Sequence, residues 1–305
     1  MADLRVHLAG LTFTTPLVLA SGPAGFGLEL AEGTDLGAVG ALTTKTITPQ
    51  PQAGNPPPRL ADAPCGALNS IGLANPGLDA FLEQVLPAIR GLAPLRIVSI
   101  AAARPDEVGR MAERLDEAAG VDLVELNLSC PNVEGEMPGR DPDATAAFVR
   151  AAARRLHRPL LAKVSPEAPD LVRVAGAALT AGAAGLTLIN AIQGMRIDRQ
   201  RGVPVFHRSF AGLSGPAIFP IALAKVFTVR RAFPTAFIVG TGGVADLGAV
   251  VEMAMAGADL VGIGAGIMAT PALPVQLSAG LSTWLAEHKL ASFREICSCA
   301  HRGGF

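Results

Sequence analysis

The stretch VELNLSCPNVEGEMPGRDP, residues 124–142, shows how this chain is built. It begins in an apolar run, changes to asparagine, serine and cysteine, and continues as a loop punctuated by glycine and proline. A short continuous apolar run indicates a strand that is buried on both of its faces. A thiol, Cys130, and two amides, Asn127 and Asn132, are therefore predicted where a buried strand ends and a loop begins.

Apolar runs of this kind recur along the chain. The eight runs are PLVLASG from Pro16, VGALTTKT from Val39, RIVSIAA from Arg96, VDLVELNLS from Val121, PLLAKVSP from Pro159, AGLTLINA from Ala184, AFIVGTGG from Ala236 and DLVGIGAG from Asp259. Helical patterns with acidic starts, basic ends or closing glycines lie between most of them. The alternation predicts an α/β fold, a (β/α)8 TIM barrel that spans residues 1–305 as a single domain. A doubly wound open sheet is the alternative.

Two intervals between the predicted strands are long. TPQPQAGNPPPRLADAPCGALNSIGLANPG follows the second strand, and QGMRIDRQRGVPVFHRSFAGLSGPAIFP follows the sixth. Both are polar and loop-rich, and both leave the C-terminal end of a strand. Because barrels of this type build their active sites at that end, we expect both insertions to lie over the site.

Composition excludes several classes of protein. The chain has 305 residues, 50% of them hydrophobic, and a net charge of −1 without a basic patch, which argues against nucleic acid as a partner. No apolar run approaches the roughly 18 residues that span a bilayer, and Asp3, Arg5 and Pro16 argue against a cleaved signal. Four cysteines without disulfide-framework spacing fit a reduced, cytoplasmic setting. The spacing of Cys297 and Cys299 does not by itself make a metal site.

The C-terminal ends of the predicted strands collect polar residues and glycines. In chain order these are Ala20, Ser21, Gly22, Lys45, Thr46, Asn127, Ser129, Cys130, Lys163, Asn190, Gly242, Gly243, Gly264 and Gly266. Glycines after the last two strands permit tight turns, and in barrels they also hold phosphate on backbone N–H groups. Since Lys45 and Lys163 face the same mouth, the set predicts a phosphorylated cofactor. A lysine beside a flavin stabilises the negative charge of the reduced ring.

Cys130 allows several interpretations. Most buried cysteines are inert small hydrophobic residues, and a thiol at a strand end also suits a nucleophile, a metal ligand or a base. No histidine and no second cysteine ends a predicted strand, which argues against a metal. A proton-transfer role fits best, because the pKa of a thiol, near 8.5, is readily lowered toward neutrality. We expect the loop at residues 133–140 to close over the thiol.

Six short motifs run along nearly the whole chain. They are GNPPPR (54–59), LNSIGLANPG (68–77), NLSCPN (127–132), LINAIQGMRID (188–198), GLSGPAIFP (212–220) and GTGG (240–243). Together they resemble class 1 dihydroorotate dehydrogenase. This resemblance implies an FMN-containing (β/α)8 barrel that oxidises dihydroorotate to orotate in de novo pyrimidine (UMP) biosynthesis.

Ile71 within NSIGL, the GMRID stretch and GLSGPAI are most similar to class 1B, the NAD-linked type. Class 1B implies a catalytic subunit that forms a homodimer and assembles as a heterotetramer with an electron-transfer subunit. That partner carries FAD and an iron–sulfur cluster and passes electrons to NAD. The membrane-bound class 2 type has a serine base, whereas this chain has Cys130.

The resemblance also implies roles for particular residues. Cys130 is the general base that removes the C5 proton, while the C6 hydride goes to the flavin N5. The implied substrate-binding residues are Lys45, Asn69, Gly72, Leu73, Asn127, Asn132 and Asn190. The implied FMN-binding residues are Ala20, Ser21, Gly22, Lys45, Thr46, Asn127, Lys163, Ser214, Gly215, Gly242, Gly243, Gly264 and Ala265. No metal is implied.

The chain departs from the family pattern at a few positions. Ala191 follows Asn190 where the family has serine or threonine, which removes a hydrogen bond worth on the order of 1 kcal/mol. Ser99 and Ala211 also differ from the usual residues. Two alternatives therefore stay open: an FMN-dependent dehydrogenase of another dihydropyrimidine, such as dihydrouracil, and an FMN-binding scaffold subunit of a redox complex.

Overall fold

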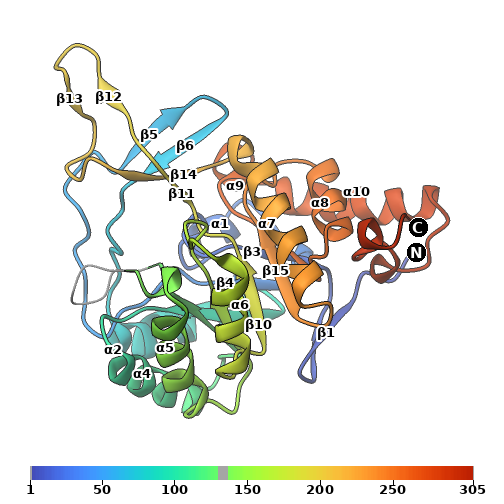
Figure 1. Cartoon of the computed structure of the whole chain (residues 1–305), viewed down its shortest axis with the longest axis horizontal. Helices are drawn as coiled ribbons and strands as arrows, with labels where there is room; N and C mark the ends of the chain where they lie inside the picture. Colours follow the sequence, from blue (N-terminus) through green and yellow to red (C-terminus); the bar gives the residue numbers. More distant parts are fainter. Residues whose placement is uncertain (1, 130–136, 305) are drawn as a thin grey trace.

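The computed structural model describes residues 2–129 and 137–304, which form a closed parallel barrel (Figure 1). The barrel strands are β3 (Leu17–Leu19), β4 (Ala41–Thr43), β7 (Leu95–Ile100), β8 (Leu123–Asn127), β9 (Leu160–Lys163), β10 (Gly185–Leu188), β15 (Phe237–Thr241) and β16 (Leu260–Ile263). Strands β16 and β3 pair in parallel and close the ring. The predicted (β/α)8 barrel is confirmed, and the open doubly wound sheet is wrong.

Side chains of the barrel strands alternate between the interior and the surrounding helices. One cluster takes residues from nearly every barrel strand and plugs the interior: Phe13, Val18, Ala41, Ile97, Leu123, Leu161, Val239 and Leu260. The neighbours along the strands, such as Val98 and Val124, belong to a second cluster that includes residues of the outer helices. Both faces are buried, and for this reason the strands read as continuous apolar runs.

Helices cover the outside of the barrel (Figure 1). The longer ones are α4 (Pro105–Glu117), α5 (Pro142–Ala153), α6 (Leu171–Thr180), α7 (Phe219–Ala232), α8 (Leu247–Met255) and α10 (Leu273–Glu287). Three begin at an aspartate whose side chain accepts a backbone N–H from the first turn: Asp141, Asp170 and Asp246. Such caps satisfy N–H groups that lack a helical partner. No helix among residues 2–129 and 137–304 has the length and apolar character to cross a membrane.

Short helical turns complete the connections. They are α1 (Leu28–Ala31), η1 (Leu36–Ala38), α2 (Leu78–Ala80), the π-helical η2 (Phe81–Val85), α3 (Leu86–Ile89), η3 (Pro138–Arg140), η4 (Pro216–Ile218), α9 (Gly266–Ala269), η5 (Phe293–Glu295) and η6 (Cys299–His301). A hairpin of β1 (Val6–Leu8) and β2 (Leu11–Phe13) precedes the barrel, and Phe13 from its end forms part of the interior plug.

The two long insertions build a second sheet together. Its strands are β5 (Leu60–Ala63), β6 (Gly66–Asn69), β11 (Ile192–Gly194) and β14 (Ala211–Ser214), and a small hairpin of β12 (Ile197–Asp198) and β13 (Val203–Pro204) extends beyond them. Strand β14 of one insertion pairs with β6 of the other, so segments far apart in sequence lie side by side (Figure 1). The insertions therefore contain an ordered antiparallel sheet where the sequence indicated loops.

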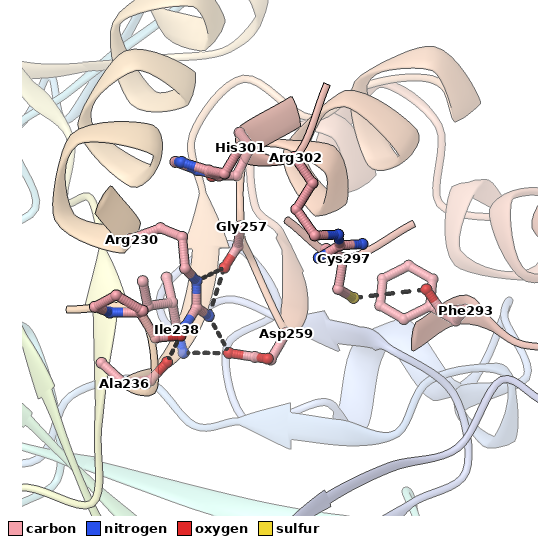
Figure 2. A network of polar contacts seen from close by, with 11 residues as sticks. Arg230, Ala236, Ile238, Gly257, Asp259, Phe293, Cys297, His301 and Arg302 are labelled. Carbon is pink, nitrogen blue, oxygen red and sulfur yellow. Dashed lines mark hydrogen bonds and ion pairs between the residues drawn. The ribbon is translucent and has the colours of Figure 1, made fainter. Parts of the chain in front are cut away.

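At the N-terminal end of the barrel strands, Arg230 of α7 is buried between the starts of β15 and β16 (Figure 2). Its guanidinium donates to the carbonyl oxygens of Gly257, Pro234 and Ala236. It also donates to the carboxylate of Asp259 at 2.6 Å. Burial raises the pKa of Asp259, and the charge of Arg230 offsets part of that effect. This arginine joins four backbone and side-chain acceptors at one point.

The C-terminal segment packs against the same end of the barrel (Figure 2). The His301 ring stacks on Phe227 with centroids 4.0 Å apart, and its Nε2 lies 3.0 Å from the carbonyl oxygen of Ala256. Burial, with the nearby charge of Asp259, raises the pKa of the Cys297 thiol to about 12. Because a thiol with so high a pKa does not form thiolate near neutrality, Cys297 acts as a packing residue.

Candidate active site

A cavity of about 620 Å³ opens at the C-terminal ends of the barrel strands, between the barrel and the sheet made by the insertions. Every predicted substrate or cofactor residue within the described ranges lines it. These residues are Ala20, Ser21, Gly22, Lys45, Thr46, Asn69, Gly72, Leu73, Asn127, Lys163, Asn190, Ser214, Gly215, Gly242, Gly243, Gly264 and Ala265. The fold therefore brings together residues that are up to 245 positions apart in sequence, from Ala20 to Ala265.

Residues 130–136 lie outside the described part of the chain. The predictions that Cys130 is the base and that Asn132 binds substrate therefore stay predictions, as does closure of the loop at residues 133–140. On either side of this segment, Ser129 and Met137 both line the cavity. The Ser129 Oγ is buried and has no hydrogen-bond partner among the described residues.

Asn127, at the end of β8, is the centre of a polar network at the cavity floor. Its Nδ2 donates to Thr46 Oγ1 at 3.3 Å, and its Oδ1 accepts from the Asn190 amide at 3.3 Å. The same Oδ1 accepts from the backbone N–H of Ser129 at 3.1 Å. Thr46 Oγ1 lies 2.9 Å from the fully buried Ser99 hydroxyl. These contacts fix the orientation of both amides before any ligand arrives.

Pairing between the two insertions positions Asn69 in the opposite wall. Strand β6 places Asn69 opposite Gly212 of β14, and the Asn69 Nδ2 donates to the Gly212 carbonyl oxygen at 3.0 Å. A Cβ at position 212 would come within 2.9 Å of the Ala191 Cβ, so this close approach requires glycine. Asn75 holds the neighbouring turn, because its Nδ2 donates to the carbonyl oxygen of Leu73 at 2.7 Å.

Lys45 is a half-buried cation in the cavity wall. Burial lowers the pKa of its ammonium, and the nearby charge of Arg59 lowers it further. Arg59 is fixed by donation to the carbonyl oxygens of Asn55 at 2.6 Å and Ala53 at 2.9 Å. An anionic ligand placed beside Lys45 would offset both unfavourable effects, which makes this wall suited to a carboxylate.

The ends of β15 and β16 present backbone to the cavity. Gly243 has φ +78° and packs so closely that a Cβ would come within 2.6 Å of the Phe219 Cβ. At Gly264, by contrast, a Cβ would meet only the Ala20 Cβ, at 3.9 Å. In the hydrogen bonds of the described residues, the N–H groups of Gly243, Gly264 and Ala265 find no acceptor within the chain. Free N–H groups at the ends of these two strands suit a phosphate.

Several residues of the cavity wall were not predicted from the sequence. Ser165 lies two positions after Lys163, and the period of two along a strand was a signal for it. Glu167 accepts from the backbone N–H of Gln193 at 2.8 Å and so ties β11 to the barrel. Phe210 comes from the second insertion, where no pattern pointed to it, and it is 56% exposed.

Comparison with known proteins identifies the family. The sequence profile of the family described as Dihydroorotate dehydrogenase matches residues 3–285. The chain belongs to the dihydroorotate dehydrogenase family. This membership confirms the resemblance drawn from the six motifs and agrees with a site at the C-terminal end of the barrel.

Two relatives cover nearly the full length of the chain. A protein of Desulforudis audaxviator named "Dihydroorotate dehydrogenase B (NAD(+)), catalytic subunit" is 40% identical over 301 residues, which cover 98% of each chain. A protein of Geotalea daltonii with the same name is 39% identical and covers 96% of this chain and 97% of its own. Both names specify the NAD-linked catalytic subunit of the family, in agreement with the class 1B resemblance.

Solved structures support the fold. Ligand-free dihydroorotate dehydrogenase from Eimeria tenella superposes with a TM-score of 0.81 at 22% identity, over 98% of this chain and 92% of that one. The same enzyme in complex with ferulenol gives a TM-score of 0.80 at 21% identity, over 98% and 89% of the two chains. At this level of identity the likeness shows the fold alone.

Proposed function

We propose that the chain is the catalytic subunit of an NAD-linked dihydroorotate dehydrogenase, which oxidises the C5–C6 bond of dihydroorotate to give orotate in pyrimidine biosynthesis. The observation that carries this proposal is the convergence in one cavity of Asn69, Asn127 and Asn190 with the cation of Lys45. A planar ring with amide edges and one carboxylate needs amide donors and acceptors and one fixed cation. This wall offers that combination.

The cavity fits FMN as the resident cofactor. Its volume of about 620 Å³ lies within the range of ligand sites, and the free N–H groups of Gly243, Gly264 and Ala265 suit a phosphate. Lys163 would balance the negative charge of the reduced ring. Bound FMN would accept the hydride from C6 of the substrate.

The remaining chemistry belongs to the chain's own residues. The Asn127 and Asn190 amides orient the substrate, and Lys45 binds its carboxylate. Cys130 is the proposed base for the C5 proton, since it stands one residue after Ser129, which lines the cavity. The apolar lining contributed by Leu73 and Ile189 excludes water from the reacting carbons.

We infer that the electrons leave through a second subunit. The relatives are named as catalytic subunits of NAD-linked enzymes, and a catalytic subunit so named works with another chain. We assign FAD and an iron–sulfur cluster to that partner, and a homodimer of this chain to the core of the heterotetramer. A cytoplasmic location is part of the same proposal.

The rival substrate is another dihydropyrimidine, such as dihydrouracil. Ala191 lines the cavity with a methyl group, and its backbone N–H donates to Asn190 Oδ1 at 2.9 Å. A hydroxyl at this position would offer one more hydrogen bond to a carboxylate. Dihydrouracil lacks the carboxylate, so the lost hydroxyl penalises it less than it penalises dihydroorotate.

Turnover with an artificial electron acceptor tests the substrate assignment. The purified chain, loaded with FMN, is supplied in parallel with dihydroorotate and with dihydrouracil. We expect dihydroorotate to be oxidised and dihydrouracil to be ignored. If the chain prefers dihydrouracil, the substrate assignment changes to that compound. If the chain binds FMN but oxidises neither compound, the scaffold role is favoured.

A further inference from the structure

Glu125 is a buried carboxylate beneath the proposed cofactor site. It lies on β8 two residues before Asn127, and only 3% of its surface is exposed. Its Oε2 accepts a hydrogen bond from the Thr187 hydroxyl at 2.8 Å, whereas its Oε1 has no hydrogen-bond partner within residues 2–129 and 137–304. A buried carboxylate oxygen without a donor is costly, so this one is expected to have an electrostatic partner nearby.

The register of the barrel strands locates this carboxylate. Strand β9 lies between β8 and β10, and Lys163 of β9 is level with Asn127 on one side and with Thr187 on the other. Glu125 is level with Leu161, one inward position below Lys163. The hydrogen bond from Thr187 to Glu125 must therefore cross the barrel interior in front of β9. It places the carboxylate in front of β9, between the level of Leu161 and the level of Lys163.

Lys163 is the cation that fits this carboxylate. It is only 6% exposed, and the buried polar side chains of the barrel strands include the neutral Thr187 of the adjacent β10, with Ser99 of β7 and Thr241 of β15 one strand farther on each side. Lys163 lines the cavity, whereas neither Glu125 nor Thr187 reaches the cavity wall. The carboxylate therefore acts on a ligand in the cavity only through its charge and through Lys163.

We propose that Glu125 is a positioning residue that acts through space on the Lys163 ammonium above it and offsets part of its charge. This inference rests on the proposed FMN site. Reduction adds negative charge to the flavin, and a carboxylate near the ring opposes it. Glu125 thus lowers the reduction potential that Lys163 alone would produce, which favours onward transfer of electrons to NAD.

Glu125→Gln tests the proposal because it removes the charge and keeps the shape and the acceptor for Thr187. The chain loaded with FMN is equilibrated without oxygen against a reference dye of known potential. We expect the ratio of reduced to oxidised flavin to rise on the order of tenfold, which equals about 30 mV for a two-electron couple. Glu252→Gln removes a charge from the exposed face of α8 and serves as the control, with no change expected.

Thr187→Val provides a second and oppositely signed test. It withdraws the hydroxyl donor from the Glu125 carboxylate, so the negative charge is less offset and the potential should fall. This variant carries the test by itself if Glu125→Gln does not fold. An unchanged potential in the folded variants would overturn the inference, whereas a wild-type chain that does not bind FMN would overturn the proposed function instead.

Discussion

The two ends of the barrel differ in whether their buried polar groups have hydrogen-bond partners within the chain. At the N-terminal end, each of the five N–H groups of Arg230 donates to an acceptor supplied by the chain. At the C-terminal end, the buried Ser129 Oγ has no hydrogen-bond partner among the described residues, and the N–H groups of Gly243 and Gly264 find no acceptor there either. The first end uses its polar groups within the fold, and the second leaves polar groups open to the cavity, where barrels of this type build their sites.

The largest effect is expected from a substitution at the N-terminal end of the barrel, where every Arg230 N–H group has an acceptor. Arg230→Met removes the N–H groups that donate to the carbonyl oxygens of Gly257, Pro234 and Ala236 and to the Asp259 carboxylate, while it keeps much of the side-chain volume. Because it leaves buried acceptors unpaired, we expect a loss of about 3–5 kcal/mol in the free energy of unfolding, measured by chemical denaturation. Arg231→Met, on the exposed side of the same helix, is the control. A loss below about 1 kcal/mol would show that the N-terminal end is not a stabilising centre.

At the ligand end, a change should cost activity and leave stability intact. Cys130→Ser replaces the proposed base with a hydroxyl that ionises far less readily, so turnover of dihydroorotate should fall about 100-fold or more. FMN content and the unfolding midpoint should not change. Unchanged turnover would remove Cys130 from the mechanism.

The half-buried cation of Lys45 makes ligand binding depend on pH. Lys45 attracts an anion while it is protonated, in a contact worth roughly 1.5–3 kcal/mol, and loses that attraction as pH rises through its pKa. Because burial and Arg59 lower this pKa, orotate affinity should begin to fall at a lower pH than the ordinary lysine value of 10.5 would give. Lys45→Arg keeps its charge over this range. If the same alkaline decline appears in that variant, Lys45 is not its cause.

The smallest expected effect concerns Gly264. An added methyl group meets only the Ala20 Cβ, at 3.9 Å, so the fold should tolerate Gly264→Ala. The methyl group would occupy space that we assign to FMN, and FMN affinity measured by fluorescence titration should fall about tenfold, or 1.4 kcal/mol. Gly33→Ala, at an exposed and open position, is the control. If Gly264→Ala binds FMN as tightly as the wild-type chain does, the cofactor does not lie against the end of β16.

The sequence predicted the barrel because its strands are buried on both faces and therefore stand out as apolar runs. The strands of the insertions were missed for two reasons. Strands β12 and β13 have only two residues each. Strands β6 and β14 pair with each other although they lie more than a hundred residues apart in sequence. Lys45, Lys163 and Asn127 were found by their places at strand ends. Asn69 and Leu73 were assigned only by family resemblance.

Other features had no local signal at all. Arg230 stands near the basic end of a helix, where an exposed arginine is the usual reading, and only the fold buries it against two strand starts. Glu125 stands within an apolar run, and nothing nearby in sequence indicates Thr187 as its hydrogen-bond partner. Contacts between distant strands decide both cases.

The proposal that the cavity binds FMN and dihydroorotate is tested most directly by an anaerobic titration of the purified, FMN-loaded chain with dihydroorotate. The yellow absorbance of oxidised flavin is followed as substrate is added, with no other electron acceptor present. We expect the band to bleach with one equivalent of dihydroorotate per flavin. A yellow protein whose band persists in excess dihydroorotate, or a chain that cannot be loaded with FMN, would contradict it.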